Sequence, residues 1–227
     1  MDLSKNRKID IKISRTNSVK KNKIKHLVVV LHGYGADGDD IIGVGNELDD
    51  FFPEVEFIAP TAPYICDNNQ HGYQWFEIPS VNKYALNNEI KSSAMQLNNF
   101  IDNELNIRNL TASDVSIVGF SQGGMMALYL GVTRSNKPLS IISFSGLMLQ
   151  GVDIKKNIKA PSILMLHGEI DTVISNEYLT SSVNYFKNAN IKIESHLIKG
   201  LGHGIDRTCI SIGASFLNNK ISNFYNS

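Results

Sequence analysis

The stretch GFSQGG, residues 119–124, lies between the apolar run SDVSIV (113–118) and the Met/Ala/Leu-rich run MMALYL (125–130). The first run is typical of a strand and the second of a helix, so the glycines mark a sharp turn between them. Residues 119–123 match G-x-S-x-G, a pattern in which a strained strand-to-helix turn exposes a serine hydroxyl. The pattern is short, and a glycine-rich junction without chemistry is the alternative. We therefore interpret Ser121 as a candidate nucleophile.

Strand-like and helix-like segments alternate along the rest of the chain. This alternation predicts an α/β fold in one domain, residues 1–227, with a mostly parallel sheet and helices on both faces. Residues 60–86 form a long loop that holds the only tryptophan, Trp75, and loops of that length are uncommon unless they are functional. The expected strands cover residues 9–13, 26–31, 56–59, 115–118, 139–144, 162–166 and 191–198, and the expected helices cover 90–105, 125–132, 179–186 and the chain from about 205.

Four motifs follow expected strands directly. In parallel sheets the functional groups gather at the carboxyl ends of the strands, so we expect these motifs to meet at one edge. They are HGYG (32–35), GFSQG (119–123), HGEID (167–171) and GLGHG (200–204).

A nucleophilic serine needs a basic side chain, and three histidines follow Ser121 in the chain. His196 lies on a strand face that it shares with charged residues, which predicts exposure to solvent. His167 precedes the acidic residues, whereas the order expected with G-x-S-x-G is serine, acid, histidine. His203 lies in a glycine-flanked loop that could direct its imidazole at the serine. We expect His203 to be the base.

The base needs an acid that orients it, and HGEID supplies Glu169 and Asp171. Both qualify chemically, and either could be a solvated loop carboxylate. Asp206 follows His203 too closely, and we interpret it as a charge in the first turn of the last helix.

An oxyanion intermediate needs two hydrogen-bond donors. One candidate is the backbone N–H of Gln122, the residue after the nucleophile. The other is the N–H of Tyr34, in the loop after an early strand. We expect His32 to hold that loop through hydrogen bonds.

The overall composition limits the class of protein. The net charge is zero, which gives no sign of nucleic-acid binding, and no apolar run has the ~18 residues of a membrane span. The N-terminus lacks a signal-peptide core, and Asp2 excludes the N-myristoylation pattern, so we expect a cytoplasmic protein. Cys209 falls on the apolar face of the last helix. Cys66 falls in the long loop and is a candidate free thiol. Neither belongs to a metal or redox motif.

The basic residues are unevenly distributed. Residues 1–25 hold nine Lys/Arg against two Asp/Glu, while the remainder holds 13 against 20. We interpret this N-terminal segment as a solvated hairpin. Attraction to anionic lipid is the alternative, so at most a peripheral membrane contact is expected.

The motifs together resemble the phospholipase/carboxylesterase family of α/β-hydrolases, which includes bacterial carboxylesterases and acyl-protein thioesterases. The resemblance implies Ser121 as nucleophile, Asp171 as triad acid and His203 as base. It also implies oxyanion donors at Tyr34 and Gln122, with Trp75 lining the acyl site near its entrance. The matching pieces are LHGYGADGDD (31–40), PTAP (60–63), QWFEI (74–78), GFSQGG (119–124), FSG (144–146), LHGEIDTVI (166–174) and GLGHGI (200–205).

The function that the resemblance implies is hydrolysis of carboxylic esters or thioesters through an acyl-enzyme, with no metal or organic cofactor. The family often has Leu at the position of Tyr34, and residues 65–73 are more polar than is usual for an acyl-channel cover. Both features favour a small substrate with a short or medium acyl group, with lysophospholipid or acylated protein as further candidates. The resemblance also raises a homodimer as a hypothesis.

Two other interpretations stay open. One is a peptidase or a dienelactone-type hydrolase on the same fold, although the latter would carry Cys at position 121 and the former usually has an extra domain. The other is a catalytically silent binding module, because a fold alone does not specify a function.

Overall fold

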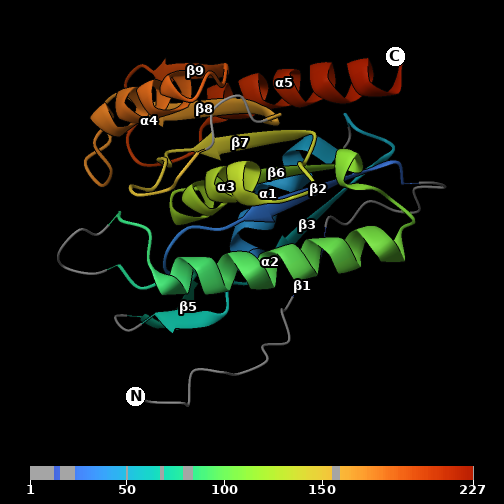
Figure 1. Ribbon diagram of the computed structural model, residues 1–227, viewed down its shortest axis with the longest axis horizontal. Coiled ribbons are helices and arrows are strands. Elements are labelled where there is room, and N and C mark those ends of the chain that lie inside the picture. Colours follow the sequence, from blue (N-terminus) through green and yellow to red (C-terminus); the bar gives the residue numbers. More distant parts are fainter. Residues whose placement is uncertain are drawn as a thin grey trace.

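A seven-stranded sheet forms the centre of the computed structural model, which describes residues 13–15, 24–49, 51–66, 69–78, 84–154 and 159–226. Its strand order is β1-β3-β2-β6-β7-β8-β9, and all neighbours are parallel except β1, which is antiparallel to β3 (Figure 1). The predicted mostly parallel α/β sheet is confirmed. The strands are β1 (Ile13–Arg15), β2 (His26–Leu31), β3 (Val55–Pro60), β6 (Val115–Phe120), β7 (Ser140–Phe144), β8 (Ser162–Gly168) and β9 (Ile193–Ile198).

Helices cover both faces of the sheet. The apolar side chains of α2, α3 and α4 join one buried cluster, and those of α1 and α5 join the cluster on the opposite face. Figure 1 shows α2 and α5 running along opposite sides of the molecule. The helices are α1 (Gly38–Asp49), α2 (Asn88–Ile107), α3 (Gln122–Thr133), α4 (Glu177–Asn188) and α5 (Arg207–Tyr225), with a 3₁₀ turn at Ala112–Asp114.

The central strand β2 explains why the core has two halves. Its run HLVVVL is buried throughout, and successive side chains point to opposite faces of the sheet. Leu27, Val29 and Leu31 enter the cluster under α3, whereas Val28 and Val30 enter the cluster under α1. The prediction of a strand buried on both faces is confirmed.

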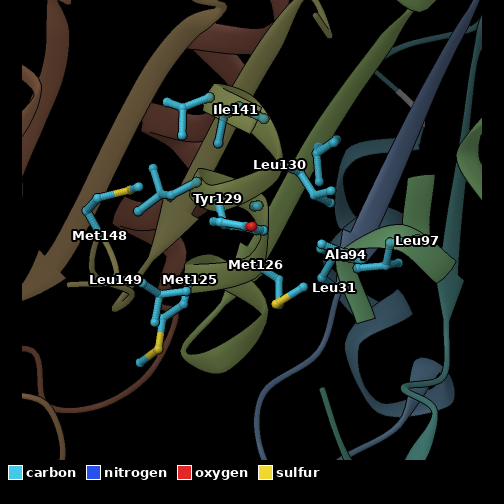
Figure 2. Packing of buried hydrophobic residues seen from close by; sticks show 14 of the residues in the cluster. Leu31, Ala94, Leu97, Met125, Met126, Tyr129, Leu130, Ile141, Met148 and Leu149 are labelled. Atoms are coloured by element: carbon cyan, nitrogen blue, oxygen red, sulfur yellow. The ribbon is translucent and has the colours of Figure 1, made fainter. Parts of the chain in front are cut away.

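Helix α3 is buried along almost its whole length. Figure 2 shows Met126 and Leu130 of this helix between Ile141 of β7 and Leu97 of α2, with Met125 beside Leu149. Burying side chains of this kind stabilises a fold by roughly 1.5–3 kcal/mol each. The helix that begins just after Ser121 is therefore fixed in position by the core.

The long-loop prediction for residues 60–86 missed a two-stranded sheet, β4 (Tyr64–Cys66) and β5 (Asn69–Gln74). The segment is polar and its pairing shifts register between Ile65 and Cys66, so it lacks the clean alternation that marks a strand. Other boundaries moved by a few residues, as at α5, which begins at Arg207. Of the strand expected at residues 9–13, only Ile13 is described, and residues 9–12 lie outside the described range, as does most of the basic segment 1–25.

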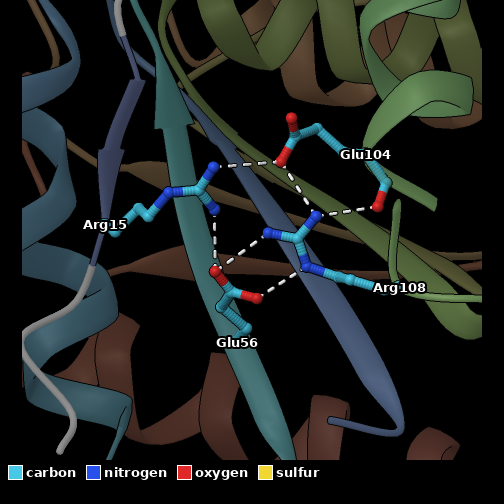
Figure 3. Close-up of polar contacts among 4 residues, drawn as sticks. All are labelled: Arg15, Glu56, Glu104 and Arg108. Carbon is cyan, nitrogen blue, oxygen red and sulfur yellow. Dashed lines mark hydrogen bonds and ion pairs between the residues drawn. The ribbon is translucent and has the colours of Figure 1, made fainter. Parts of the chain in front are cut away.

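An ionic cluster joins the edge strand β1 to the body of the molecule (Figure 3). Arg108 contacts Glu56 through two nitrogens at 2.6 and 2.9 Å and contacts Glu104 at 2.9 Å. Arg15 reaches the same two carboxylates, at 2.8 Å and 3.3 Å. Burial opposes ionisation of Glu56, but the hydrogen bonds from the two arginines outweigh it and hold its pKa below the usual value.

Candidate active site

Ser121 sits at the tip of the turn between β6 and α3. Its backbone has φ 53° and ψ −117°, a strained conformation for a residue other than glycine. The flanking glycines permit this turn. A Cβ on Gly119 would lie 2.2 Å from the carbonyl oxygen of Gly123, and a Cβ on Gly123 would lie 2.2 Å from that of Leu31. Positions 119 and 123 therefore have no room for a side chain.

The structure brings together the serine, a histidine and an aspartate from three separate segments. His203, in the loop after β9, has Nε2 3.0 Å from Ser121 Oγ. Its Nδ1 lies 2.7 Å from Oδ2 of Asp171, in the loop after β8. The side chain of Asp171 is fully buried, whereas that of His203 is 16% exposed. A substrate can therefore approach the side chain of His203, while the carboxylate of Asp171 is shielded from solvent.

Glu169 and Asp171, the two candidates for the acid, make different contacts in the structure. Glu169 accepts a hydrogen bond from the backbone N–H of Gly200 at 3.0 Å and is exposed. Only Asp171 of the two is hydrogen-bonded to His203. Asp206 accepts from the N–H of Cys209 at 2.8 Å as the N-cap of α5, in line with its interpretation as a helix-start charge.

Asp171 is held as an anion by its surroundings. Burial opposes ionisation, but the hydrogen bond from His203 and those from the N–H groups of Ile174 and Val173 lower its pKa below the usual value. Both N–H groups donate to Oδ1 at 2.9 Å, which leaves Oδ2 for His203. The carboxylate can thus fix the orientation of the imidazole and stabilise its protonated form.

His167 is a contact that sequence reasoning did not find. Its side chain is fully buried, with Nε2 3.3 Å from Asp171 Oδ2 and 2.8 Å from the carbonyl oxygen of Ile174. Because a carbonyl oxygen only accepts, Nε2 carries the proton and donates it to this turn. His203, not His167, is hydrogen-bonded to Ser121, as expected because His167 precedes the acidic residues in the chain. His167 instead stabilises the turn around Asp171. No local pattern marked this contact, because His167 and Asp171 do not lie on a common helix.

His32 anchors the loop that follows β2. Nδ1 lies 2.7 Å from the carbonyl oxygen of Gly33, and Nε2 accepts the backbone N–H of Ala62 at 2.9 Å. These partners require the neutral ring with its proton on Nδ1. Burial lowers the pKa of His32, which keeps the ring neutral. The predicted role of His32 in holding this loop is confirmed.

The other candidate residues belong to segments that contact the turn at Ser121. The Gln122 side chain is buried, and the Tyr34 side chain is 38% exposed. Trp75 is 1% exposed, and its indole N–H donates to the His32 carbonyl oxygen at 2.9 Å. The placement of Trp75 in an acyl site and the oxyanion roles of Tyr34 and Gln122 stay predictions.

Several features lie away from this site. His196 is 41% exposed beside Glu194, as expected. Cys66 and Cys209 are free thiols, both buried, and burial raises the pKa of Cys209 to about 11. A cavity of about 1210 Å³ lies at the amino ends of β6, β7 and β8, opposite the serine. Among the described residues, no three His, Cys, Asp or Glu side chains are grouped to hold a metal ion.

The fold and the Ser–His–Asp row define the α/β-hydrolase class. Residues 15–221 match the family model described as phospholipase/carboxylesterase, and the chain belongs to that family. It is therefore a carboxylic ester hydrolase.

Individual relatives agree with this assignment. The chain is 25% identical to acyl-protein thioesterase 1 homolog 1 of Dictyostelium discoideum, over 92% of this chain and 97% of the relative. It is 28% identical to acyl-protein thioesterase 1 of Schizosaccharomyces pombe, over 78% and 83%. Among solved structures, esterase PE8 is 30% identical with a TM-score of 0.81, over 92% of this chain and 97% of that chain. The carboxylesterase of Bacillus cereus shares the fold, with a TM-score of 0.77 at 14% identity over 94% and 96%.

Proposed function

We propose that this chain hydrolyses carboxylic esters or thioesters through an acyl-enzyme on Ser121. The observation that carries the proposal is the continuous row from Ser121 Oγ through His203 to the buried Asp171, with contacts of 3.0 and 2.7 Å. A serine hydroxyl is a weak nucleophile at its ordinary pKa, and a hydrogen-bonded imidazole activates it. The row supplies both the base and the group that orients it.

The reaction proceeds in two halves. His203 accepts the proton of Ser121 Oγ as the oxygen attacks the acyl carbonyl, and Asp171 stabilises the imidazolium that forms. His203 then gives this proton to the departing alcohol or thiol. A water molecule, deprotonated by the same imidazole, attacks the acyl-enzyme, and His203 returns the proton to Ser121 Oγ as the bond to the acyl group breaks and the acid leaves. The N–H groups of Gln122 and Tyr34 would stabilise the oxyanion in both halves.

The substrate class is narrower in this proposal than in the family. Several relatives carry names of acyl-protein thioesterases, and structural neighbours carry names of carboxylesterases. We assign short and medium acyl groups, because Tyr34, where the family often has Leu, is 38% exposed and its larger side chain would narrow the approach to Ser121. Lysophospholipid and acylated protein stay candidate leaving groups.

Among the described residues, no helix has the length and apolar character needed to cross a membrane. The cytoplasmic location and the homodimer stay predictions, as does the solvated hairpin of residues 1–25, with attraction to anionic lipid as its alternative. The peptidase, dienelactone-type and silent-module interpretations are not favoured by the family assignment.

A series of p-nitrophenyl esters and matched acyl thioesters, from two to sixteen carbons, tests the proposal. The expected kcat/KM is greatest for short and medium chains and disappears in Ser121→Ala. Hydrolysis that persists in Ser121→Ala would overturn the role of the serine. A maximum at sixteen carbons would overturn the assignment of chain length.

A further inference from the structure

The β5 strand is bonded through its backbone to the loop that carries Tyr34. The N–H of Gly35 donates to the carbonyl oxygen of Tyr73 at 2.9 Å, and the N–H of Tyr73 donates to that of Ala36 at 3.0 Å. This pair of bonds forms an isolated antiparallel bridge between the loop and the β4–β5 hairpin. The position of Tyr34 is therefore tied to the position of Tyr73.

The Gln122 side chain is bonded to the same segment a few residues later. Its Oε1 accepts the N–H of Trp75 at 2.8 Å, and its Nε2 donates to the carbonyl oxygen of Phe76 at 2.7 Å. The side chain is 1% exposed, and both ends of the amide bond to backbone groups. A primary amide can satisfy an N–H and a C=O together, whereas no apolar side chain of similar size can.

Further bonds hold this segment in place from behind. Ser93 of α2 donates to the carbonyl oxygen of Trp75, and the indole N–H of Trp75 donates to the carbonyl oxygen of His32. Residues 73–76 thus bridge the loop after β2 and the start of α3. These are the two places that carry the proposed oxyanion donors.

We propose that the Gln122 side chain is a positioning residue, and that with residues 73–76 it sets the spacing between the N–H of Tyr34 and the N–H of Gln122. The inference rests on the proposed function. Oxyanion stabilisation depends on donors that are already in place when charge develops, so a loosened bridge weakens transition-state binding more than substrate binding. This role is separate from that of the Gln122 backbone, which every residue at this position would supply.

The test compares Gln122→Met, which keeps the length of the side chain and removes both hydrogen bonds, with Ser182→Ala. Ser182 is buried and lies far from Ser121 in the sequence. Its substitution by Ala removes two hydrogen bonds, one from the N–H of Met148 and one to the carbonyl oxygen of Tyr178. It controls for a general loss of stability. In Gln122→Met we expect kcat/KM for a short ester to fall about 10- to 100-fold, below the ~10²–10³-fold that removal of an oxyanion donor costs.

A trifluoromethyl ketone supplies the second measurement, because it forms a hemiketal oxyanion on the serine. Its inhibition constant should rise by the same factor as kcat/KM falls, with KM and the acidic limb of the pH profile nearly unchanged. Ser182→Ala should lower the melting temperature and leave both constants within about twofold. Ser93→Ala, a milder change that frees the Trp75 carbonyl, should show the same pattern at about 2- to 10-fold.

The outcomes separate the two proposals. In the first case the wild type hydrolyses the ester, but Gln122→Met has unchanged kcat/KM or a change in KM alone. This result overturns the positioning role and leaves the proposed function intact. If Gln122→Met does not fold, unchanged inhibition in Ser93→Ala overturns it instead. A wild type that neither hydrolyses esters nor binds the ketone overturns both.

Discussion

Asp171 keeps its charge in a fully buried position because the surrounding donors are directed at both of its oxygens. The N–H groups of Val173 and Ile174 occupy Oδ1, and His203 occupies Oδ2. Burial alone would raise the pKa of such a carboxyl group, and the hydrogen bonds reverse the sign. The charge of Asp171 therefore depends on three hydrogen bonds, of 2.9, 2.9 and 2.7 Å.

Substitution of Asp171 by Asn should leave the packing intact and remove the charge that orients His203. We expect kcat to fall by about 10⁴-fold, the magnitude seen when a buried triad aspartate is replaced by its amide. Steady-state kinetics on a short ester measures the change. Glu169→Gln, two residues away and outside the row, should keep kcat within about twofold. Equal losses in the two variants would contradict the assignment of Asp171.

The sequence was sufficient to predict the nucleophile and the base, but not all the hydrogen bonds that hold the site together. Ser121 and His203 follow from motif and chain order, while the residues alone left Glu169 and Asp171 open. The contact of His167 with Asp171 and the bonds of the Gln122 side chain were missed. They depend on how a side chain packs against a distant or tightly turned backbone, which no local pattern records.

The turn between β6 and α3 is the element on which the site depends. Strand and helix approach so closely that Gly123 lies against the carbonyl oxygens of Leu31 and His32. Any side chain at this position must push the start of α3 away from β2. The nucleophile and the loop after β2 would then move apart.

Gly123→Ala should therefore damage both folding and activity. Its Cβ would lie 2.2 and 2.5 Å from two backbone oxygens, so the backbone itself must shift. We expect a loss of several kcal/mol in unfolding free energy, as for severe overpacking, and loss of ester hydrolysis. Gly43→Ala in the exposed face of α1 is the matched control. It meets no atom within 4 Å and should stabilise by about 0.5–1 kcal/mol.

Denaturant unfolding of the two variants beside the wild type measures these effects. A Gly123→Ala protein with wild-type stability and activity would contradict the close approach at the turn. The α2 helix was predictable because its apolar residues recur at helical spacing, whereas the buried strands were predictable as short continuous apolar runs rich in β-branched residues. The α3 helix was predictable as a Met/Ala/Leu-rich run directly after the glycine turn. The β4–β5 hairpin was not, because its stability comes from contacts such as that of Tyr73 with Ala36.

The sheet as a whole was predictable from the alternation of elements, since parallel strands buried on both faces read as continuous apolar runs. The strand order was not, because it depends on long-range pairing. His26, a buried polar residue at the amino end of the sheet, makes the unfolding free energy of the whole molecule depend on pH. It is fully buried, with Nε2 2.9 Å from Ser116 Oγ and Asp114 near enough to act on its charge.

Burial lowers the pKa of His26 to about 4, although Asp114 opposes the shift. Between about pH 6.5 and 4 the unfolded chain binds a proton here that the folded chain does not. The unfolding free energy should therefore fall as pH drops through this window, by about 3 kcal/mol from His26, with His32 acting in the same direction.

Urea unfolding at pH 7.5, 6, 5 and 4.5 measures the slope. His26→Gln should flatten it, whereas Gly43→Ala should displace the curve and keep its slope. An unchanged slope in His26→Gln would show that other groups govern the response to acid.

The proposed mechanism requires Ser121 to be an activated nucleophile, and a fluorophosphonate reacts with such a serine to form a covalent adduct. The purified protein is treated with the reagent, and its intact mass is measured beside Ser121→Ala and His203→Ala. We expect one adduct on the wild type and none on either variant within the same time. Folded wild type that stays unmodified, or an adduct that persists in Ser121→Ala, would contradict the proposed mechanism.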